Sequence, residues 1–362
     1  MNAKYYPSLD GLRAFAVMLV MLGHAITPRV RSGGIGVDVF FVLSGFLITS
    51  LLSAEIERYG RLNLRNFYVR RILRLFPALF VTTALFCIIA TLQDRQFPTR
   101  TALIAITHTA NWARAVFDVH LGLVQHYWSL ACEEQYYLIW PLVVLMLERT
   151  LRGPDQKALV LIALAVALAV YRYSLADKVD AARIYFALDT HMDGLVLGSA
   201  LAYLLRGSAR EVLSRQGRLL GWVVVPLCGL ILAWIMYRMT WRDPWMGRYG
   251  YALTAFASAI LIADLMAGSH SWQRWPLSLA PAVYVGRISY GIYLLHPLVF
   301  YVVALVLPAT LPRSVSIPIK IAASIAAAAL SYHAYERRFL KLKERFGRGG
   351  AVVVGETREG LA

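Results

Sequence analysis

The sequence is poor in the features that mark the common soluble enzyme classes. Its 362 residues include 21 acidic residues and only three cysteines, none of them in a CxxC pair. It contains no HExxH, no Walker A loop and no glycine-flanked serine elbow, which argues against a zinc hydrolase, a P-loop nucleotidase and a serine hydrolase. Because the cysteines all lie in apolar segments, we interpret them as packing residues and expect no metal site.

Apolar residues are what the sequence has in abundance. They make up 59% of the chain, and the mean hydropathy is +0.56. They recur in blocks of about 20 residues, the length that crosses a bilayer as a helix. This pattern excludes a soluble protein and predicts an all-α, polytopic membrane bundle of about ten transmembrane helices. The first block lacks a basic leader and a small-residue cleavage site, so we expect it to be a retained helix.

Ten candidate spans follow from the apolar blocks between charged loops. They cover residues 9–26, 36–52, 72–92, 127–147, 158–171, 191–205, 219–239, 249–266, 283–307 and 318–335. We expect residues 101–112 to lie as a helix on the membrane surface. Residues 1–345 are expected to form one membrane domain, and residues 346–362 a disordered cytoplasmic tail.

The net charge of +16 comes from 37 basic residues that cluster in particular loops. An even number of spans places both termini on one side of the membrane. The segments on that side hold roughly twice as many Lys and Arg residues as the opposite loops, so we expect both termini in the cytoplasm. The basic residues are explained as orientation signals and require no nucleic-acid partner.

Two ionisable residues lie within the first span. Arg13 and His24 are eleven residues apart, which is three helical turns plus about 20°, so they share one face. Asp10 precedes Arg13 by one turn and can pair with it. An unpaired cation in hydrocarbon is costly, so this face must look onto protein or a water-filled cavity. Imidazole suits a general base, and Arg suits a phosphate or an oxyanion. A packing pair satisfied by neighbouring carbonyls is the alternative.

The segment FYVRRILRLFP places three arginines at the start of the third span. Arg70 and Arg74 are i, i+4 neighbours on one face, with Arg71 beside them. Such a cluster suits a polyphosphate such as the nucleotide end of coenzyme A, because the guanidinium fork matches phosphate geometry. Juxtamembrane arginines are also common topology signals, and the spacing leaves both interpretations open.

The segment HYWSLACEEQYYLIWP opens the fourth span from the outer side. Its polar and aromatic residues near the helix start include Trp128, Ser129, Glu133, Glu134 and Tyr137. A sugar-binding wall with a spare acid or base would need such residues. The helix dipole and an interfacial aromatic belt explain them equally well.

The segment GRISYGIYLLHP places His296 in the middle of the ninth span, directly before Pro297. An intramembrane His beside a Pro more often marks a pathway or a site than a core position. An inert, hydrogen-bonded His is the alternative.

Polar residues also open the sixth span. Asp189, His191 and Asp193 stand at alternate positions, which do not share a helical face, so we do not expect them to hold a metal. Gly194 and Gly198 form a small-xxx-small step that indicates helix packing.

Six motifs, taken in order, resemble those of the acyltransferase-3 family of integral membrane acyltransferases. They are YYPSLDGLRAFAVMLVMLGH, GVDVFFVLSGFLI, FYVRRILRLFP, HYWSLACEEQYYLIWP, GRISYGIYLLHP and SYHAYERRFLKLK. The resemblance covers residues 5–343. One departure is His191, where related sequences often carry Arg.

The resemblance implies an enzyme that moves an acyl group, usually acetyl, from cytoplasmic acyl-coenzyme A to a hydroxyl of a carbohydrate. The acceptor would be a surface, periplasmic or lipid-linked glycan at a bacterial inner membrane, whose lipids surround the protein. By resemblance, Arg13 and His24 are an essential pair, and the three arginines of the third span form the family's basic motif.

We expect His24 to be the general base, and Glu133 or Glu134 to orient His24 or the acceptor. Further residues are expected to contact substrate: Asp10, Trp128, Ser129, Tyr137 and His296. A covalent acyl-enzyme is equally compatible with these residues. The competing class is a transporter or flippase for a lipid-linked sugar or small anion that uses the same Arg and His.

Overall fold

The computed structural model describes residues 5–26, 34–93, 98–268, 270–308 and 310–346. Within these ranges every regular element is helical. Nine of the described helices are long and apolar enough to cross a membrane, and the shorter apolar helix α10 (Asp193–Leu204) accompanies them. The prediction of an all-α, polytopic membrane bundle is confirmed.

Each predicted span except the ninth corresponds to one observed helix or one continuous helical run. The long helices are α1 (Pro7–Ala25), α2 (Ile35–Tyr59), α3 (Leu64–Leu92), α6 (Tyr127–Thr150), α7 (Pro154–Leu175), the continuous α12, η2 and α13 (Gly217–Arg238), η3 with α14 (Met246–Ala267), α17 (Ser289–Val306), and α18 (Arg313–Ser331) continued by η4 and α19 (Arg337–Glu344). The sixth predicted span is α10, which has 12 residues. Shorter helices connect them: α4 (Pro98–Ile106), α5 (Ala110–Ala115), η1 (Gly122–Val124), α8 (Ala181–Phe186), α9 (Leu188–His191), α11 (Ala209–Arg215), α15 (Arg274–Leu277) and α16 (Ala280–Arg287).

The ninth predicted span, residues 283–307, is not one helix. It breaks at Ile288 into α16 and α17, and α16 packs against α1. The approach is close because Gly286 has no side chain: a Cβ atom there would overlap the carbonyl oxygen of Asp10. The membrane-spanning part therefore begins at Ser289.

The helix predicted over residues 101–112 is also interrupted. It forms α4 and α5, separated at His108, whose φ of 51° lies in the left-handed region. The side-chain amide of Gln135 on α6 donates to the carbonyl oxygen of His108 at 2.7 Å. A tertiary hydrogen bond thus fixes a turn that no local sequence pattern announces.

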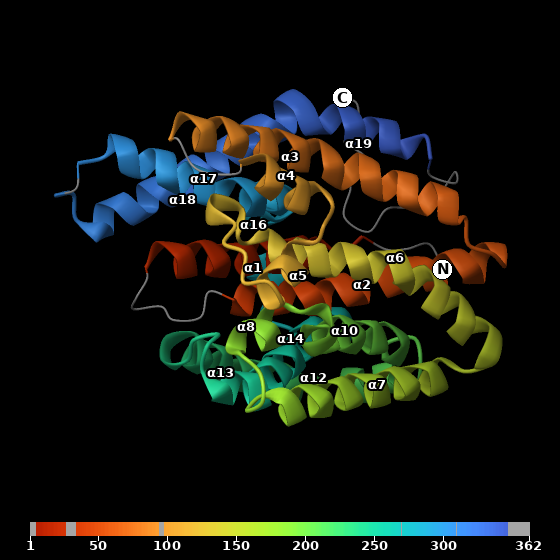
Figure 1. Cartoon of the computed structure of the whole chain (residues 1–362). Helices are drawn as coiled ribbons and strands as arrows, with labels where there is room; N and C mark the ends of the chain where they lie inside the picture. Colours follow the sequence, from red (N-terminus) through yellow and green to blue (C-terminus); the bar gives the residue numbers. More distant parts are fainter. Residues whose placement is uncertain (1–4, 27–33, 94–97, 269, 309, 347–362) are drawn as a thin grey trace.

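The helices stack in three layers (Figure 1). One layer holds α3, α17, α18 and α19, the middle layer holds α1, α2 and α6, and the third holds α7, α10, α13 and α14. The central helix is α2, which contacts α1 and α6 within its layer and α10 and α14 in the next. The middle layer therefore carries the residues that the other two enclose.

The contact between α2 and α10 depends on glycine. A Cβ atom on Gly198 would overlap the carbonyl oxygen of Val42, and one on Gly45 would overlap that of Leu195. Gly194 has only ordinary contacts. The predicted packing role is thus confirmed most clearly at Gly198, where the two backbones touch.

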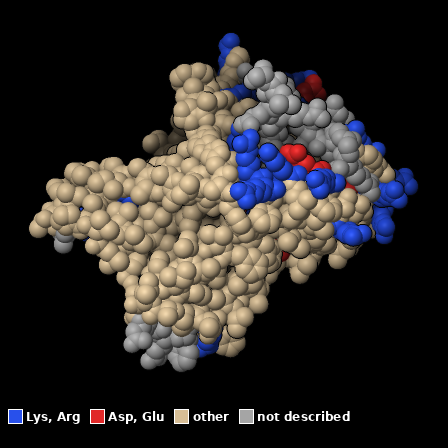
Figure 2. Space-filling model, turned by 90° about the horizontal axis from the view of Figure 1, so that it is seen from above, with Lys and Arg blue, Asp and Glu red and all other residues tan. Residues whose placement is uncertain are grey.

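The lateral surface is apolar, as expected for a surface that faces lipid. Large apolar side chains such as Leu159 on α7 and Leu230 on α13 are 67% and 69% exposed. In contrast, Lys and Arg gather at one end of the molecule (Figure 2). The tail predicted over residues 346–362 lies outside the described residues, apart from Phe346.

Candidate functional site

Helix α1 presents Arg13 and His24 at well-separated depths. Eleven residues correspond to about 17 Å along a helix axis. The predicted partner of Arg13 is present, because Asp10 Oδ1 lies 3.9 Å from Arg13 Nη1. Asp10 is itself buried and accepts a hydrogen bond of 2.9 Å from the hydroxyl of Tyr5. The buried carboxylate therefore anchors the inner end of the Arg13 face.

Arg13 lines an elongated cavity of about 240 Å³, here called the central cavity. Along α2 its lining extends from Val37 to Tyr59, which is about 33 Å of helix at the standard rise. A hydrocarbon core is about 30 Å thick. The central cavity therefore follows most of the thickness of the bundle.

The central cavity is basic. Its charged lining residues are Arg13, Arg58, Arg70, Arg71, Arg74 and Lys343, together with Glu55, Glu133 and Glu134. Six cations and three carboxylates leave a net charge of +3 among the described lining residues. The three arginines predicted to bind phosphate thus share one cavity with Arg13, an arrangement that attracts a polyanion.

Arg71 stacks on an aromatic ring at the middle of this lining. Its guanidinium carbon lies 3.6 Å from the centroid of the Tyr137 ring, within cation–π range. The Tyr137 hydroxyl donates to Glu133 Oε2 at 3.4 Å, and Glu134 lines the same stretch. The two glutamates, predicted near the outer side, therefore face the basic cluster, and the described residues show no contact between them and His24.

Ser129 and Tyr293 form part of the cavity wall near the start of α6. The Tyr293 hydroxyl donates to the carbonyl oxygen of His126 at 2.9 Å, and Ser129 Oγ lies 2.6 Å from the same hydroxyl. On α17, Tyr293 stands three residues before His296, and their ring centroids are 5.9 Å apart. The wall of the cavity is thus one side chain away from His296.

His296 contacts His24 directly. His296 Nε2 lies 3.1 Å from His24 Nδ1, so the structure pairs the two intramembrane histidines that the sequence places in different spans. His296 is fully buried and His24 is exposed. Neither is among the described residues that line the central cavity. Among the described residues, the cavity lining is connected to His24 by the contact of Tyr293 with His296 and that of His296 with His24.

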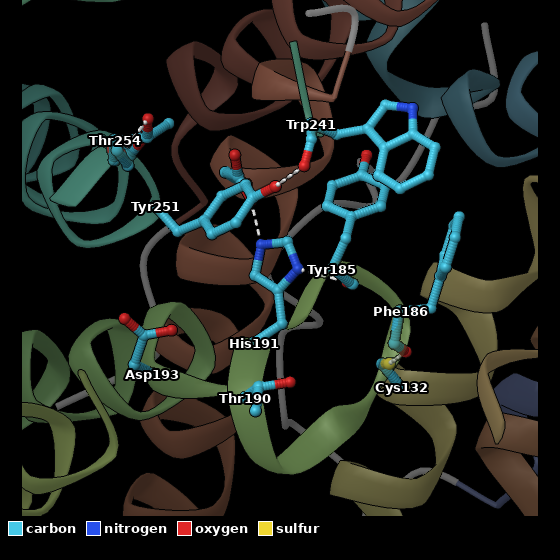
Figure 3. A network of polar contacts seen from close by, with 12 residues as sticks. Cys132, Tyr185, Phe186, Thr190, His191, Asp193, Trp241, Tyr251 and Thr254 are labelled. Carbon is cyan, nitrogen blue, oxygen red and sulfur yellow. Dashed lines mark hydrogen bonds and ion pairs between the residues drawn. The ribbon is translucent and has the colours of Figure 1, made fainter. Parts of the chain in front are cut away.

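Figure 3 shows a different cluster, around His191. Trp128 belongs to this cluster through its contact with the His191 ring. Its ring stacks on the His191 ring with a centroid distance of 5.6 Å. His191 lies between Tyr185 and Tyr251, and its Nε2 is 2.7 Å from Asp38 Oδ1. Trp128, 4% exposed, is not among the described cavity-lining residues, so the structure does not bring it together with the other predicted substrate residues.

The three polar residues of the sixth span turn to three separate partners. His191 pairs with Asp38, whereas Asp193 Oδ1 accepts from Arg172 Nη1 at 2.6 Å, and Asp189 pairs with Arg183. Arg172 is fully buried. No group of three potential metal ligands occurs among the described residues.

His108 is a cavity residue that sequence reasoning missed. It lines the central cavity from the turn between α4 and α5, outside the membrane-spanning helices. Burial lowers the pKa of His108 from 6.5 to about 4, so its ring is neutral at pH 7. No periodic pattern marked this position, because only the tertiary bond from Gln135 turns it inward.

Tyr293 was also missed, although a signal existed. It precedes His296 by three residues in the motif GRISYGIYLLHP, and residues at i and i+3 share a helical face. Applying that spacing to His296 would have included Tyr293 in the candidate site.

Comparison with known proteins shows the family of the chain. Residues 6–333 match the family described as "Acyltransferase domain", the acyltransferase-3 family. O-acetyltransferase OatA of Staphylococcus aureus is 31% identical over 317 residues, which cover 83% of this chain and 52% of the relative. Peptidoglycan O-acetyltransferase OatA of Listeria monocytogenes is 32% identical over 353 residues, which cover 92% of this chain and 56% of the relative.

The chain spans about half the length of these curated relatives. No solved structure matches it. The ordered motifs, the basic central cavity and the family match over residues 6–333 lead to one assignment: the chain belongs to the acyltransferase-3 family.

Proposed function

We propose that this chain is a membrane O-acetyltransferase that moves an acetyl group from acyl-coenzyme A to a hydroxyl of a carbohydrate. The observation that carries the proposal is the basic central cavity, which leads along the bundle to a wall beside the His24–His296 pair. The names of the relatives support the reaction, since both are O-acetyltransferases and one is a peptidoglycan O-acetyltransferase. A glycan of that class is the acceptor we propose.

The donor fits the charge of the cavity. Coenzyme A carries its phosphates at its nucleotide end, and the net charge of +3 in the lining favours them. Arg70, Arg71 and Arg74 would hold the phosphates through guanidinium hydrogen bonds. The long, narrow shape of the cavity suits an extended pantetheine arm that carries the thioester toward the Ser129–Tyr293 wall.

Distance decides the role of Arg13. It stands about 17 Å from His24 along the helix axis, which is farther than an arginine side chain can reach. Arg13 therefore cannot stabilise the oxyanion that forms at the thioester carbon when His24 activates the acceptor hydroxyl. We assign Arg13 to the donor, where it adds a positive charge to the phosphate-binding lining.

Glu133 and Glu134 belong to the donor end as well. The sequence allowed either of them to orient His24, but their contacts are with Tyr137 and the arginine-lined stretch. We propose that the two carboxylates compensate the positive charge of Arg71, which would otherwise be an uncompensated cation inside the membrane.

The chemistry requires a base and a leaving group. His24 takes the proton of the acceptor hydroxyl, and the hydroxyl oxygen bonds to the thioester carbonyl carbon. The carbon–sulfur bond then breaks, and the thiolate leaves and takes up the proton. For this to occur, the thioester has to pass the Ser129–Tyr293 hydrogen bond of 2.6 Å, so we assign a gating role to that contact.

If acyl-coenzyme A comes from the cytoplasm, the basic end of the cavity must lie on the cytoplasmic side of the bacterial inner membrane. The concentration of Lys and Arg at one end of the molecule supports this orientation (Figure 2). Both termini would then be cytoplasmic.

The decisive experiment uses the purified full chain in lipid nanodiscs with acetyl-coenzyme A and a soluble peptidoglycan fragment. An enzyme releases free thiol and acetylates the fragment, and His24→Ala abolishes turnover while acetyl-coenzyme A still binds. The matched control is Arg65→Ala, on the exposed face of α3 outside the described cavity lining. If the donor neither binds nor reacts, but a lipid-linked sugar crosses sealed vesicles, the transporter alternative replaces the enzyme.

Rapid quenching with labelled acetyl-coenzyme A in the absence of acceptor tests the route. Label that stays on the denatured protein indicates an acyl-enzyme. Its absence, with transfer restored by acceptor, indicates direct attack.

A further inference from the structure

His296 and His24 form a hydrogen-bonded pair of imidazoles between α17 and α1. The ring centroids are 5.0 Å apart, and His296 Nε2 lies 3.1 Å from His24 Nδ1. His296 is 0% exposed, whereas His24 is exposed. The pair therefore joins an enclosed ring to one that is exposed at the surface of the bundle.

The other nitrogen of His296 determines where its proton lies. Nδ1 is 2.8 Å from the carbonyl oxygen of Tyr293 and 3.2 Å from that of Ile292. Carbonyl oxygens only accept, so Nδ1 must carry a hydrogen. A buried ring flanked by His24 and His126, with centroids 5.0 and 5.2 Å away, is neutral because a charge there would be unsolvated. His296 Nε2 therefore offers a lone pair to His24.

His24 Nδ1 consequently faces acceptors only. Besides His296 Nε2, it lies 3.0 Å from the carbonyl oxygen of Val20. Val20 stands four residues before His24 in α1. Its carbonyl oxygen is therefore the normal helical acceptor of the backbone N–H of His24. His296 Nε2 is thus the acceptor without a competing helical bond. With its hydrogen on Nδ1, a neutral His24 has its lone pair on Nε2.

We propose that His296 is a positioning residue that fixes His24 as the Nδ1–H tautomer and so makes Nε2 the atom that accepts the proton of the attacking hydroxyl. This inference rests on the proposed function. Nε2 takes the hydroxyl proton while the oxygen bonds to the thioester carbon, and the carbon–sulfur bond breaks. Nε2 then passes the proton to the departing thiolate. Throughout, Nδ1–H stays bonded to His296, which stabilises the transient imidazolium.

The opposite tautomer would be unproductive. With its hydrogen on Nε2, His24 would present a donor to the acceptor hydroxyl and could not remove its proton. The buried His296 thus serves the role that an orienting acceptor serves behind any histidine base, although it is itself an imidazole.

Two substitutions at His296 separate its two hydrogen bonds. His296→Gln places an amide oxygen where Nε2 was and keeps an acceptor for His24. His296→Asn places its amide where Nδ1 was and keeps only the bond to the Tyr293 carbonyl. We expect His296→Asn to lower kcat on the order of 100-fold and His296→Gln to recover most of it. The KM for acetyl-coenzyme A should be unchanged in both, because His296 is not among the described cavity-lining residues. Equal loss in both variants, or none in His296→Asn, would overturn the proposal.

Nitrogen-15 NMR of histidine-labelled protein tests the tautomer in the unmutated chain. The signals of His24 are identified by their absence in His24→Ala. We expect its Nδ1 to be protonated and its Nε2 to be bare at neutral pH. A protonated Nε2 on neutral His24 contradicts the inference even if the protein is an active acetyltransferase. Because this readout needs no turnover, it stands apart from the test of the proposed function.

Discussion

The guanidinium of Arg71 lies over the ring of Tyr137, 3.6 Å from its centroid, inside the central cavity. The stack holds the planar fork in place and leaves its edges for phosphate oxygens. A lysine would keep the charge but would lose both the stack and the fork. This geometry favours the proposal that Arg71 belongs to an anion site over the alternative that it serves only as a topology signal.

Replacing Arg71 should weaken donor binding. We expect Arg71→Ala to raise the Kd for acetyl-coenzyme A at least tenfold, about 1.4 kcal/mol, and Arg71→Lys to recover only part of the loss. Isothermal titration with the protein in nanodiscs measures both. Arg65→Ala, an exposed arginine on the same helix, should bind as the unmutated protein does. If the three variants bind alike, the arginines serve only to orient the chain.

Sequence reasoning predicted the helices and the contact of Arg13 with Asp10, and what it could not predict has one physical origin. Hydropathy and charge located every span, and helical spacing paired Arg13 with Asp10 correctly. Contacts between helices that are far apart in the sequence leave no periodic pattern from which they could be predicted. The bond from Gln135 that turns His108 inward, and the contact of His296 with His24, join residues far apart in the chain. The position of Trp128 could not be predicted for the same reason, because its ring neighbours come from three other helices, α2, α8 and α9.

Gly198 should tolerate no side chain. Its backbone touches Val42 of α2, so Gly198→Val forces the two central helices apart. Overpacking of this kind costs about 1–3 kcal/mol. We expect a clear drop in the thermal unfolding midpoint in detergent. Gly229→Val on α13 is the matched control, because a Cβ atom there meets no described heavy atom within 4 Å. An equal drop in both variants would show that valine, and not the helix contact, is responsible.

The buried pair of Arg172 and Asp193 should be sensitive to the loss of one partner. Asp193→Ala leaves a fully buried guanidinium without its carboxylate, and breaking such pairs typically costs about 3–5 kcal/mol. The double variant Arg172→Met/Asp193→Leu removes both charges and should regain much of that stability. In contrast, Glu211→Ala, which breaks the exposed pair with Arg215, should cost at most about 1 kcal/mol. Additive losses in the double variant would contradict this account.

His108 should make stability depend on pH. The unfolded chain takes up a proton at this residue near pH 6.5 and the folded chain near pH 4, so the stabilisation from the neutral ring is complete above pH 6.5 and is lost as the pH falls toward 4. His108→Asn, which tolerates the left-handed backbone, removes this titration. The difference in unfolding midpoint between the two proteins should therefore change between pH 6.5 and 4 and stay constant above. A constant difference throughout would mean that His108 titrates normally.

The orientation of the bundle can be tested at two exposed serines. Ser214 follows α10 at the end that we place in the cytoplasm, whereas Ser314 opens α18 at the opposite end, and both are exposed. Cys132 and Cys228 are buried and Cys87 is half-buried, so an introduced cysteine at either serine should dominate labelling. In intact spheroplasts, a membrane-impermeant maleimide should label Ser314→Cys and leave Ser214→Cys unlabelled until the membrane is opened. The reverse pattern would place the basic end of the central cavity outside the cell, where acyl-coenzyme A is absent, and would remove the donor from the proposed reaction.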